Sequence, residues 1–117
     1  MARLLIVEDE WLIAAEYVAL VRKAGHSVAG PFARVAPALS AIEGEGVDAA
    51  FLDVNLGGGD TSFPVAQSLQ SRGIPFAFLT GYGGHGGLTA FHSAPVLSKP
   101  VTPQALLVTL GKLLPHP

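Results

Sequence analysis

The chain has 117 residues, half of them hydrophobic and 14% charged, which is typical of one globular domain with a substantial core. Seven Lys and Arg residues against nine Asp and Glu residues leave no basic excess, which argues against nucleic-acid binding. The chain contains no cysteine, so disulfides, cysteine-ligated zinc and a cysteine nucleophile are excluded.

The N-terminus lacks the long apolar stretch and small-residue cleavage site of a signal peptide, so we expect a cytoplasmic protein. Between Arg72 and Lys99 no residue is charged, over a span long enough to cross a bilayer. Pro75, Pro95 and the glycines of 81–87 divide this span into short apolar runs. We therefore predict a strand, a loop and another strand there.

Short apolar runs alternate with stretches of helical periodicity along the chain. The predicted strands are residues 4–7, 27–29, 49–52, 76–79 and 96–97. The predicted helices are residues 10–24, 35–42, 63–69, a fourth within 87–92, and 104–114. The apolar faces expected for the first and last helices are Ile13, Tyr17, Leu20, Val21 and Ala24, and Leu106, Leu107, Leu110 and Leu114. Strands that are apolar throughout are covered on both faces, which predicts a parallel sheet in a three-layer α/β sandwich.

Polar residues directly follow four of these predicted strands. They are Glu8, Asp9 and Glu10 after the first, Asp53 after the third, Thr80 after the fourth, and Ser98 and Lys99 after the fifth. Because the carboxyl ends of parallel strands lie along one edge of a sheet, we expect these side chains to meet in one crevice.

Crowded carboxylates repel one another and attract a cation. Glu8, Asp9 and Asp53 would offer only oxygen ligands, which favours Mg²⁺. With the acids neutralised, one carboxylate can attack phosphorus and form an aspartyl phosphate. Lys99 and Thr80 would then donate to the phosphoryl oxygens, where negative charge accumulates.

The set of motifs resembles the response-regulator receiver domains of two-component signalling, over essentially the whole chain. The resemblance rests on Glu8-Asp9, on Asp53 within Phe-Leu-Asp-Val-Asn-Leu, on Thr80, and on Lys99-Pro100.

The resemblance implies a flavodoxin-like (βα)5 fold with strand order 2-1-3-4-5, and one receiver domain spanning residues 1–117. It also implies that Asp53 is the phosphoacceptor and that Thr80 and Lys99 respond to the phosphoryl group. The implied Mg²⁺ ligands are Glu8, Asp9, Asp53 and the backbone carbonyl of Asn55. The peptide bond before Pro100 is expected to be cis, which would fix the aim of Lys99.

Residues 78–82, Phe-Leu-Thr-Gly-Tyr, look like the signature of the FAT GUY receivers, with Leu79 in place of Ala. Similar proteins are partnered with HWE or HisKA2-type histidine kinases, so such a kinase, or a histidine phosphotransferase, is the implied phosphodonor. Val96 stands where many receivers have an aromatic switch residue. We therefore expect Tyr82 and the loop at 83–87 to move with Thr80, Lys99 and Pro100.

Two further departures from the family pattern are Glu8, where many receivers have Asp, and Gly57, where many have Pro. Gly57 predicts a more mobile loop after Asp53. These departures, with Val96, favour an alternative function as a phosphorylation-independent interaction module.

Two alternatives to a receiver site are purely structural roles for the charged residues, and a phosphatase that also uses an aspartate nucleophile. The three acids could merely cap a helix, and Lys99 could be a surface lysine. A haloacid-dehalogenase-like phosphatase would need a second acid two residues after its nucleophile, where this chain has Asn55. We therefore expect a non-enzymatic signalling protein that acts by protein contact or by onward phosphotransfer.

Overall fold

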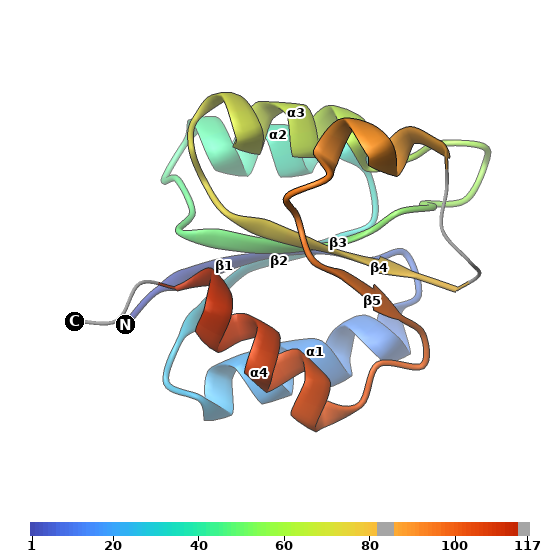
Figure 1. Ribbon diagram of the computed structural model, residues 1–117. Coiled ribbons are helices and arrows are strands. Elements are labelled where there is room, and N and C mark those ends of the chain that lie inside the picture. Colours follow the sequence, from blue (N-terminus) through green and yellow to red (C-terminus); the bar gives the residue numbers. More distant parts are fainter. Residues whose placement is uncertain (82–85, 115–117) are drawn as a thin grey trace.

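The computed structural model describes residues 1–81 and 86–114, which form a five-stranded parallel sheet between two helical layers (Figure 1). The strands are β1 (Arg3–Val7), β2 (Ser27–Phe32), β3 (Ala49–Asp53), β4 (Phe76–Thr80) and β5 (Val96–Ser98). The helices are α1 (Trp11–Lys23), α2 (Val35–Glu43), α3 (Phe63–Ser71), the 3₁₀ helix η1 (Gly86–Phe91) and α4 (Pro103–Leu113). The strand order β2-β1-β3-β4-β5 confirms the predicted flavodoxin-like topology.

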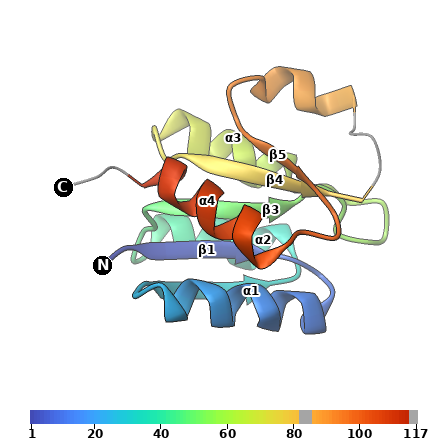
Figure 2. The ribbon, with the colours of Figure 1, turned by 60° about the horizontal axis from the view of Figure 1, so that its bottom comes forward.

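The sheet has a separate core on each face. α1 and α4 cover one face, while α2, α3 and η1 lie over the other (Figures 1 and 2). Side chains of a strand alternate between the two cores, so Leu4 and Ile6 face α1 and α4 while Leu5 and Val7 face the opposite layer. All residues of β3 and β4 are buried, which explains why these central strands are apolar on both sides.

The edge strands are less covered than we predicted. In β2 only Ala29 is fully buried, and in β5 Val96 remains 45% exposed. A strand at the edge of a sheet has a neighbour on one side only, so a helical layer covers it incompletely.

Two predictions about helices are wrong, and a third is confirmed in position only. The predicted fourth helix is present as η1, but it is a single 3₁₀ segment that begins with two glycines, which disfavour an α-helix. Ala24 is exposed because α1 ends at Lys23 and Ala24 only caps it. Leu107 is 39% exposed, because Leu106, Leu110 and Leu113 occupy the buried face of α4.

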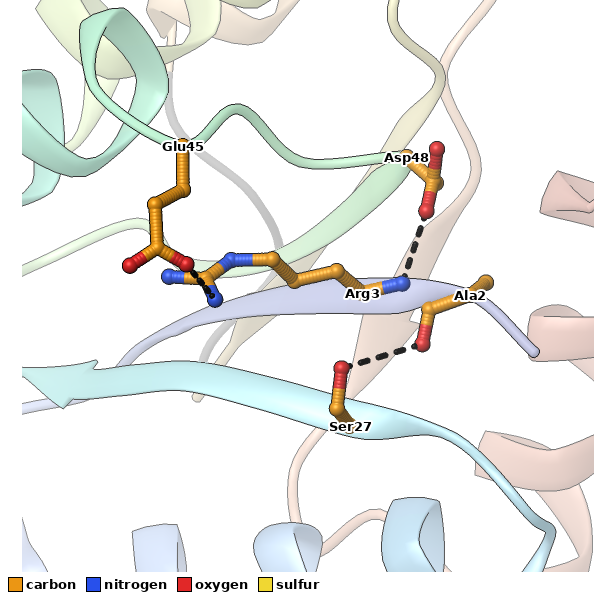
Figure 3. A network of polar contacts seen from close by, with 5 residues as sticks. All are labelled: Ala2, Arg3, Ser27, Glu45 and Asp48. Atoms are coloured by element: carbon orange, nitrogen blue, oxygen red, sulfur yellow. Dashed lines mark hydrogen bonds and ion pairs between the residues drawn. The ribbon is translucent and has the colours of Figure 1, made fainter.

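The amino ends of the strands are tied together by polar contacts around Arg3 (Figure 3). The backbone N–H of Arg3 donates to Asp48 Oδ2 at 2.7 Å, and its guanidinium pairs with Glu45 at 2.8 Å. Ser27 Oγ donates to the carbonyl of Ala2. These contacts connect β1 with β2 and with the segment that leads into β3.

None of the helices in the described part of the chain is long and apolar enough to cross a membrane.

Candidate functional site

The predicted polar residues meet at the carboxyl edge of the sheet. Glu8 and Asp9 follow β1, Asp53 and Thr80 are the last residues of β3 and β4, and Lys99 follows β5. The strand register pairs Val7 with Leu52, Asp53 with Leu79, and Thr80 with Ser98, so the strands end nearly level. The crevice expected from a parallel sheet is therefore present.

The acidic part of the site consists of Glu8, Asp9 and Asp53. One carboxylate oxygen from each residue lies within 4.8 Å of those of the other two. Glu8 and Asp53 are buried, with 2% and 5% of their surface exposed, whereas Asp9 is exposed. The site is thus open on the Asp9 side and enclosed on the other two.

Lys99 brings a positive charge into the acidic cluster. Its Nζ lies 2.8 Å and 3.2 Å from the two carboxylate oxygens of Glu8, and 3.2 Å from Asp53 Oδ2. The peptide bond between Lys99 and Pro100 is cis, as expected. With 18% of its side chain exposed and two acids in contact, Lys99 is not an ordinary surface lysine.

Thr80 lies beside Lys99 at the end of β4. It is buried, and its carbonyl accepts a hydrogen bond from the backbone N–H of Lys99 at 2.8 Å. Tyr82, the other residue expected to move, lies outside the described residues.

Backbone hydrogen bonds within the loop after Asp53 hold its two ends together. The N–H of Leu56 donates to Asp60, that of Asp60 to Gly57, and that of Ser62 to Val54. Asn55 is exposed and forms a β-bridge with Thr61.

Two structural features explain why residue 57 is a glycine. The φ angle of Gly57 is +78°, which L side chains rarely adopt. An added Cβ would also lie 3.3 Å from Asp9 Oδ2, which is closer than most such contacts. Gly57 therefore lets the loop approach Asp9.

Burial and crowding shift the proton affinities of the site. Burial, together with sharing a hydrogen bond with Asp53, raises the pKa of Glu8 from 4.5 to about 8 despite the opposing effect of Lys99. Partial burial and the neighbouring Asp53 also raise the pKa of Asp9. For Lys99, burial favours the neutral amine, but contacts with Glu8 and Asp53 outweigh it and raise the pKa. One ammonium is therefore too little charge for three carboxylates.

Helix capping does not explain the acids. The N-cap residue of α1 is Glu10, and among the described residues its side chain makes no capping hydrogen bond. Glu8 is directed to Lys99 instead.

The donor set fits Mg²⁺. The three clustered acids offer oxygen ligands and no sulfur or nitrogen. The raised pKa of buried Glu8 shows that its negative charge is not fully compensated, and a divalent cation would supply the missing charge.

Sequence reasoning missed the pairing of Lys99 with Glu8, because it assigned Lys99 only to a phosphoryl group. It also missed the small space between position 57 and Asp9, and a cluster of four phenylalanine rings in the core on the α2 and α3 face of the sheet: Phe63, Phe76, Phe78 and Phe91. The spacing of Phe76 and Phe78 indicates one face of a strand, but nothing in the sequence connects them with Phe63 or Phe91.

Solved structures of other proteins are similar to this chain. SdrG from Sphingomonas melonis Fr1 is 42% identical, with a TM-score of 0.84 over 97% of this chain and 96% of SdrG. The BeF3-activated conformation of SdrG from Pseudomonas melonis Fr1 is 43% identical, with a TM-score of 0.77 over the same shares. The signal receiver domain of a modulated diguanylate cyclase from Desulfovibrio desulfuricans G20 is 25% identical, with a TM-score of 0.84 over 97% of this chain and 94% of that domain.

A CheY-like response regulator receiver domain protein from Methanospirillum hungatei JF-1 has the same fold. It is 23% identical, with a TM-score of 0.82 over 96% of this chain and 92% of that protein. No protein-family model matches the sequence, and no curated protein matches it.

Proposed function

Since the chain belongs to the CheY-like response-regulator receiver domains, we propose that it accepts a phosphoryl group on Asp53 and signals through the conformational change that follows. The observation that carries this proposal is the position of Asp53. Its carboxylate ends a fully buried strand, lies 3.2 Å from the Lys99 ammonium, and belongs to a cluster of three acids. An aspartate placed in this way combines a nucleophilic oxygen with groups that bind phosphoryl charge.

The proposed chemistry is transfer from a phosphohistidine. An oxygen of Asp53 attacks phosphorus, the new O–P bond forms as the P–N bond breaks, and the imidazole nitrogen leaves with the electron pair. Lys99 would exchange part of its contact with Glu8 for a phosphoryl oxygen, and Thr80 would donate its hydroxyl to another. Hydrolysis reverses the state: water attacks phosphorus, which releases inorganic phosphate and restores the carboxylate.

Glu8, Asp9 and Asp53 would hold Mg²⁺, together with the backbone carbonyl of Asn55. When bound, the cation supplies positive charge between the anionic carboxylate and the anionic phosphoryl group. Because a carboxyl ligand must lose its proton to bind a metal ion, Glu8 would contribute to this site only when it is ionised.

The proposed partner is a histidine kinase of the HWE or HisKA2 type, or a histidine phosphotransferase. Its histidine has to reach Asp53, so the donor must cover the rim of the crevice. Trp11 and Leu12, in the first turn of α1, follow Asp9 by two and three residues and are 75% and 67% exposed. Apolar side chains with so much exposed surface are suited to contact the donor.

The experiment is to incubate the protein with Mg²⁺ and acetyl phosphate and to measure its intact mass. We expect a mass gain of one phosphoryl group in the wild type and none in Asp53→Asn, which keeps the shape of the side chain. Asp48→Asn is the matched control, because Asp48 lies at the other end of β3.

A wild type without mass gain, and without an NMR response to beryllofluoride, would contradict the proposal and favour the phosphorylation-independent interaction module. Labelling of Asp53→Asn at the wild-type rate would show that another residue is the nucleophile.

A further inference from the structure

Two segments that leave the crevice end in the same aromatic cluster. The loop 54–62 follows Asp53 and leads to Phe63, and the chain after Thr80 leads to η1, which ends at Phe91. The rings of Phe63 and Phe91 are stacked, with centroids 5.8 Å apart and an angle of 27° between their planes. Segments that are separate in sequence are thus in direct contact.

Phe78 of β4 joins this stack. Its ring lies edge-on to Phe63 at 5.8 Å and contacts Phe91 at 5.5 Å. Phe78 is fully buried and precedes Thr80 by two residues on the same strand. The stack is therefore anchored to the strand that carries Thr80.

Backbone hydrogen bonds connect the segment after Asp53 to β4 and to the residue before Phe63. The N–H of Val54 donates to the carbonyl of Leu79 at 2.9 Å, and the N–H of Ser62 donates to the carbonyl of Val54 at 3.0 Å. Val54 is fully buried. A displacement of the backbone next to Asp53 would consequently move Ser62 and, with it, Phe63.

The stack also has space to rearrange. Phe76 and Phe91 line an open cavity of about 390 Å³ near the amino end of β4. Most interior side chains cannot move without a clash, whereas Phe91, the ring of the stack that borders this cavity, is less confined. Val96, by contrast, is a small, 45% exposed residue of β5 without an aromatic ring that could change position.

We propose that the stack of Phe63 on Phe91 couples the loop after Asp53 to η1, so that phosphorylation moves η1 through these two rings. The inference rests on the proposed function, because the moving force is the phosphoryl group on Asp53. The stack would be an element with two arrangements whose populations the phosphoryl group shifts.

The experiment compares amide NMR spectra with and without Mg²⁺ and beryllofluoride. The variants are Phe63→Leu, Phe91→Leu and the double variant. Phe51→Leu is the matched control for Phe91→Leu, since Phe51 is also a buried phenylalanine but packs on the opposite face of the sheet. Phe63 is only partly buried, so its variant remains informative if Phe91→Leu fails to fold.

We expect residues 54–62 to respond in all variants as in the wild type. The response of residues 86–91 should be largely lost in both single variants, no further reduced in the double variant, and retained in Phe51→Leu. Retention of the η1 response in both single variants, or equal loss in Phe51→Leu, would overturn the coupling alone. A wild type that neither responds at 54–62 nor gains mass with acetyl phosphate would overturn the proposed function and the coupling with it.

Discussion

The two ends of β1 carry charged clusters that differ in burial: the cluster at the amino end is exposed to water, and the cluster at the carboxyl end is largely buried. At the amino end, the Arg3 guanidinium pairs with Glu45, whose side chain is 78% exposed, so water screens the pair. At the carboxyl end, Lys99 pairs with Glu8, whose side chain is fully buried, and further acids crowd around it. Excess charge of one sign inside a protein is unfavourable for folding. The first cluster therefore ties strands of the sheet together, whereas the second gathers buried acids around one ammonium, an arrangement that is common in functional sites.

The largest expected difference between the two ends is the pH dependence of stability. The pKa of Glu8 is raised from 4.5 to about 8, so the folded state binds a proton that the unfolded state releases. This contribution to stability is complete below pH 4.5 and is lost as the pH rises toward 8. Without divalent cations, we expect the free energy of unfolding to fall by up to roughly 4 kcal/mol over this range.

Urea denaturation in EDTA at several pH values measures this effect. Glu8→Gln, which cannot ionise, should remove most of the slope, whereas Glu45→Gln should leave it unchanged. Mg²⁺ should reverse the slope, because it binds only the ionised acid. A wild-type stability that does not change with pH would show that Glu8 is ionised throughout.

The next largest effect is expected when the Lys99 ammonium is removed. Lys99→Met leaves buried Glu8 without its partner, which usually costs several kcal/mol, but Glu8 can take up a proton instead, so we expect a loss of about 2 kcal/mol at pH 8. Arg3→Met, the equivalent change at the amino end, should cost less than about 1 kcal/mol. Urea denaturation of both variants measures the difference. Equal losses would mean that the two clusters do not differ in character.

The parallel sheet, and the meeting of the polar residues at its carboxyl edge, could both be predicted from the pattern of apolar strands in the sequence. Central strands that are apolar on both faces indicate a parallel sheet, and such a sheet brings Glu8, Asp53 and Lys99 to one edge. Neither step depends on side-chain detail.

The features that sequence could not provide depend on distances across the sheet. The pairing of Lys99 with Glu8, and the small space between position 57 and the Asp9 carboxylate, depend on how the ends of neighbouring strands and loops are placed. The meeting of Phe63 with Phe91 depends on the path of a 3₁₀ helix whose glycine-rich sequence does not fix its course.

The two ends of the sheet also differ in what surrounds a glycine with a positive φ angle. Gly57 near the acids and Gly46 near the amino end have φ angles of +78° and +80°, so alanine at either position should cost about 1 kcal/mol. Only at Gly57 would the new Cβ meet Asp9, at 3.3 Å, whereas at Gly46 it meets nothing within 4 Å. Gly57→Ala should therefore weaken Mg²⁺ binding several-fold in calorimetric titration, and Gly46→Ala should not. Equal Mg²⁺ affinities would show that Asp9 does not bind the cation in its present position.

The smallest effect is expected at the amino-end ion pair. Glu45→Ala removes the partner of the Arg3 guanidinium, but an exposed pair contributes little, so the free energy of unfolding should change by less than about 0.5 kcal/mol. The hydrogen bond from the backbone N–H of Arg3 to Asp48 Oδ2 remains in this variant and keeps β1 connected to the segment before β3. Mass gain with acetyl phosphate should match the wild type. A reduced gain would mean that charge at the amino end influences Asp53 through the sheet, and the two ends would then have to be treated as one electrostatic system.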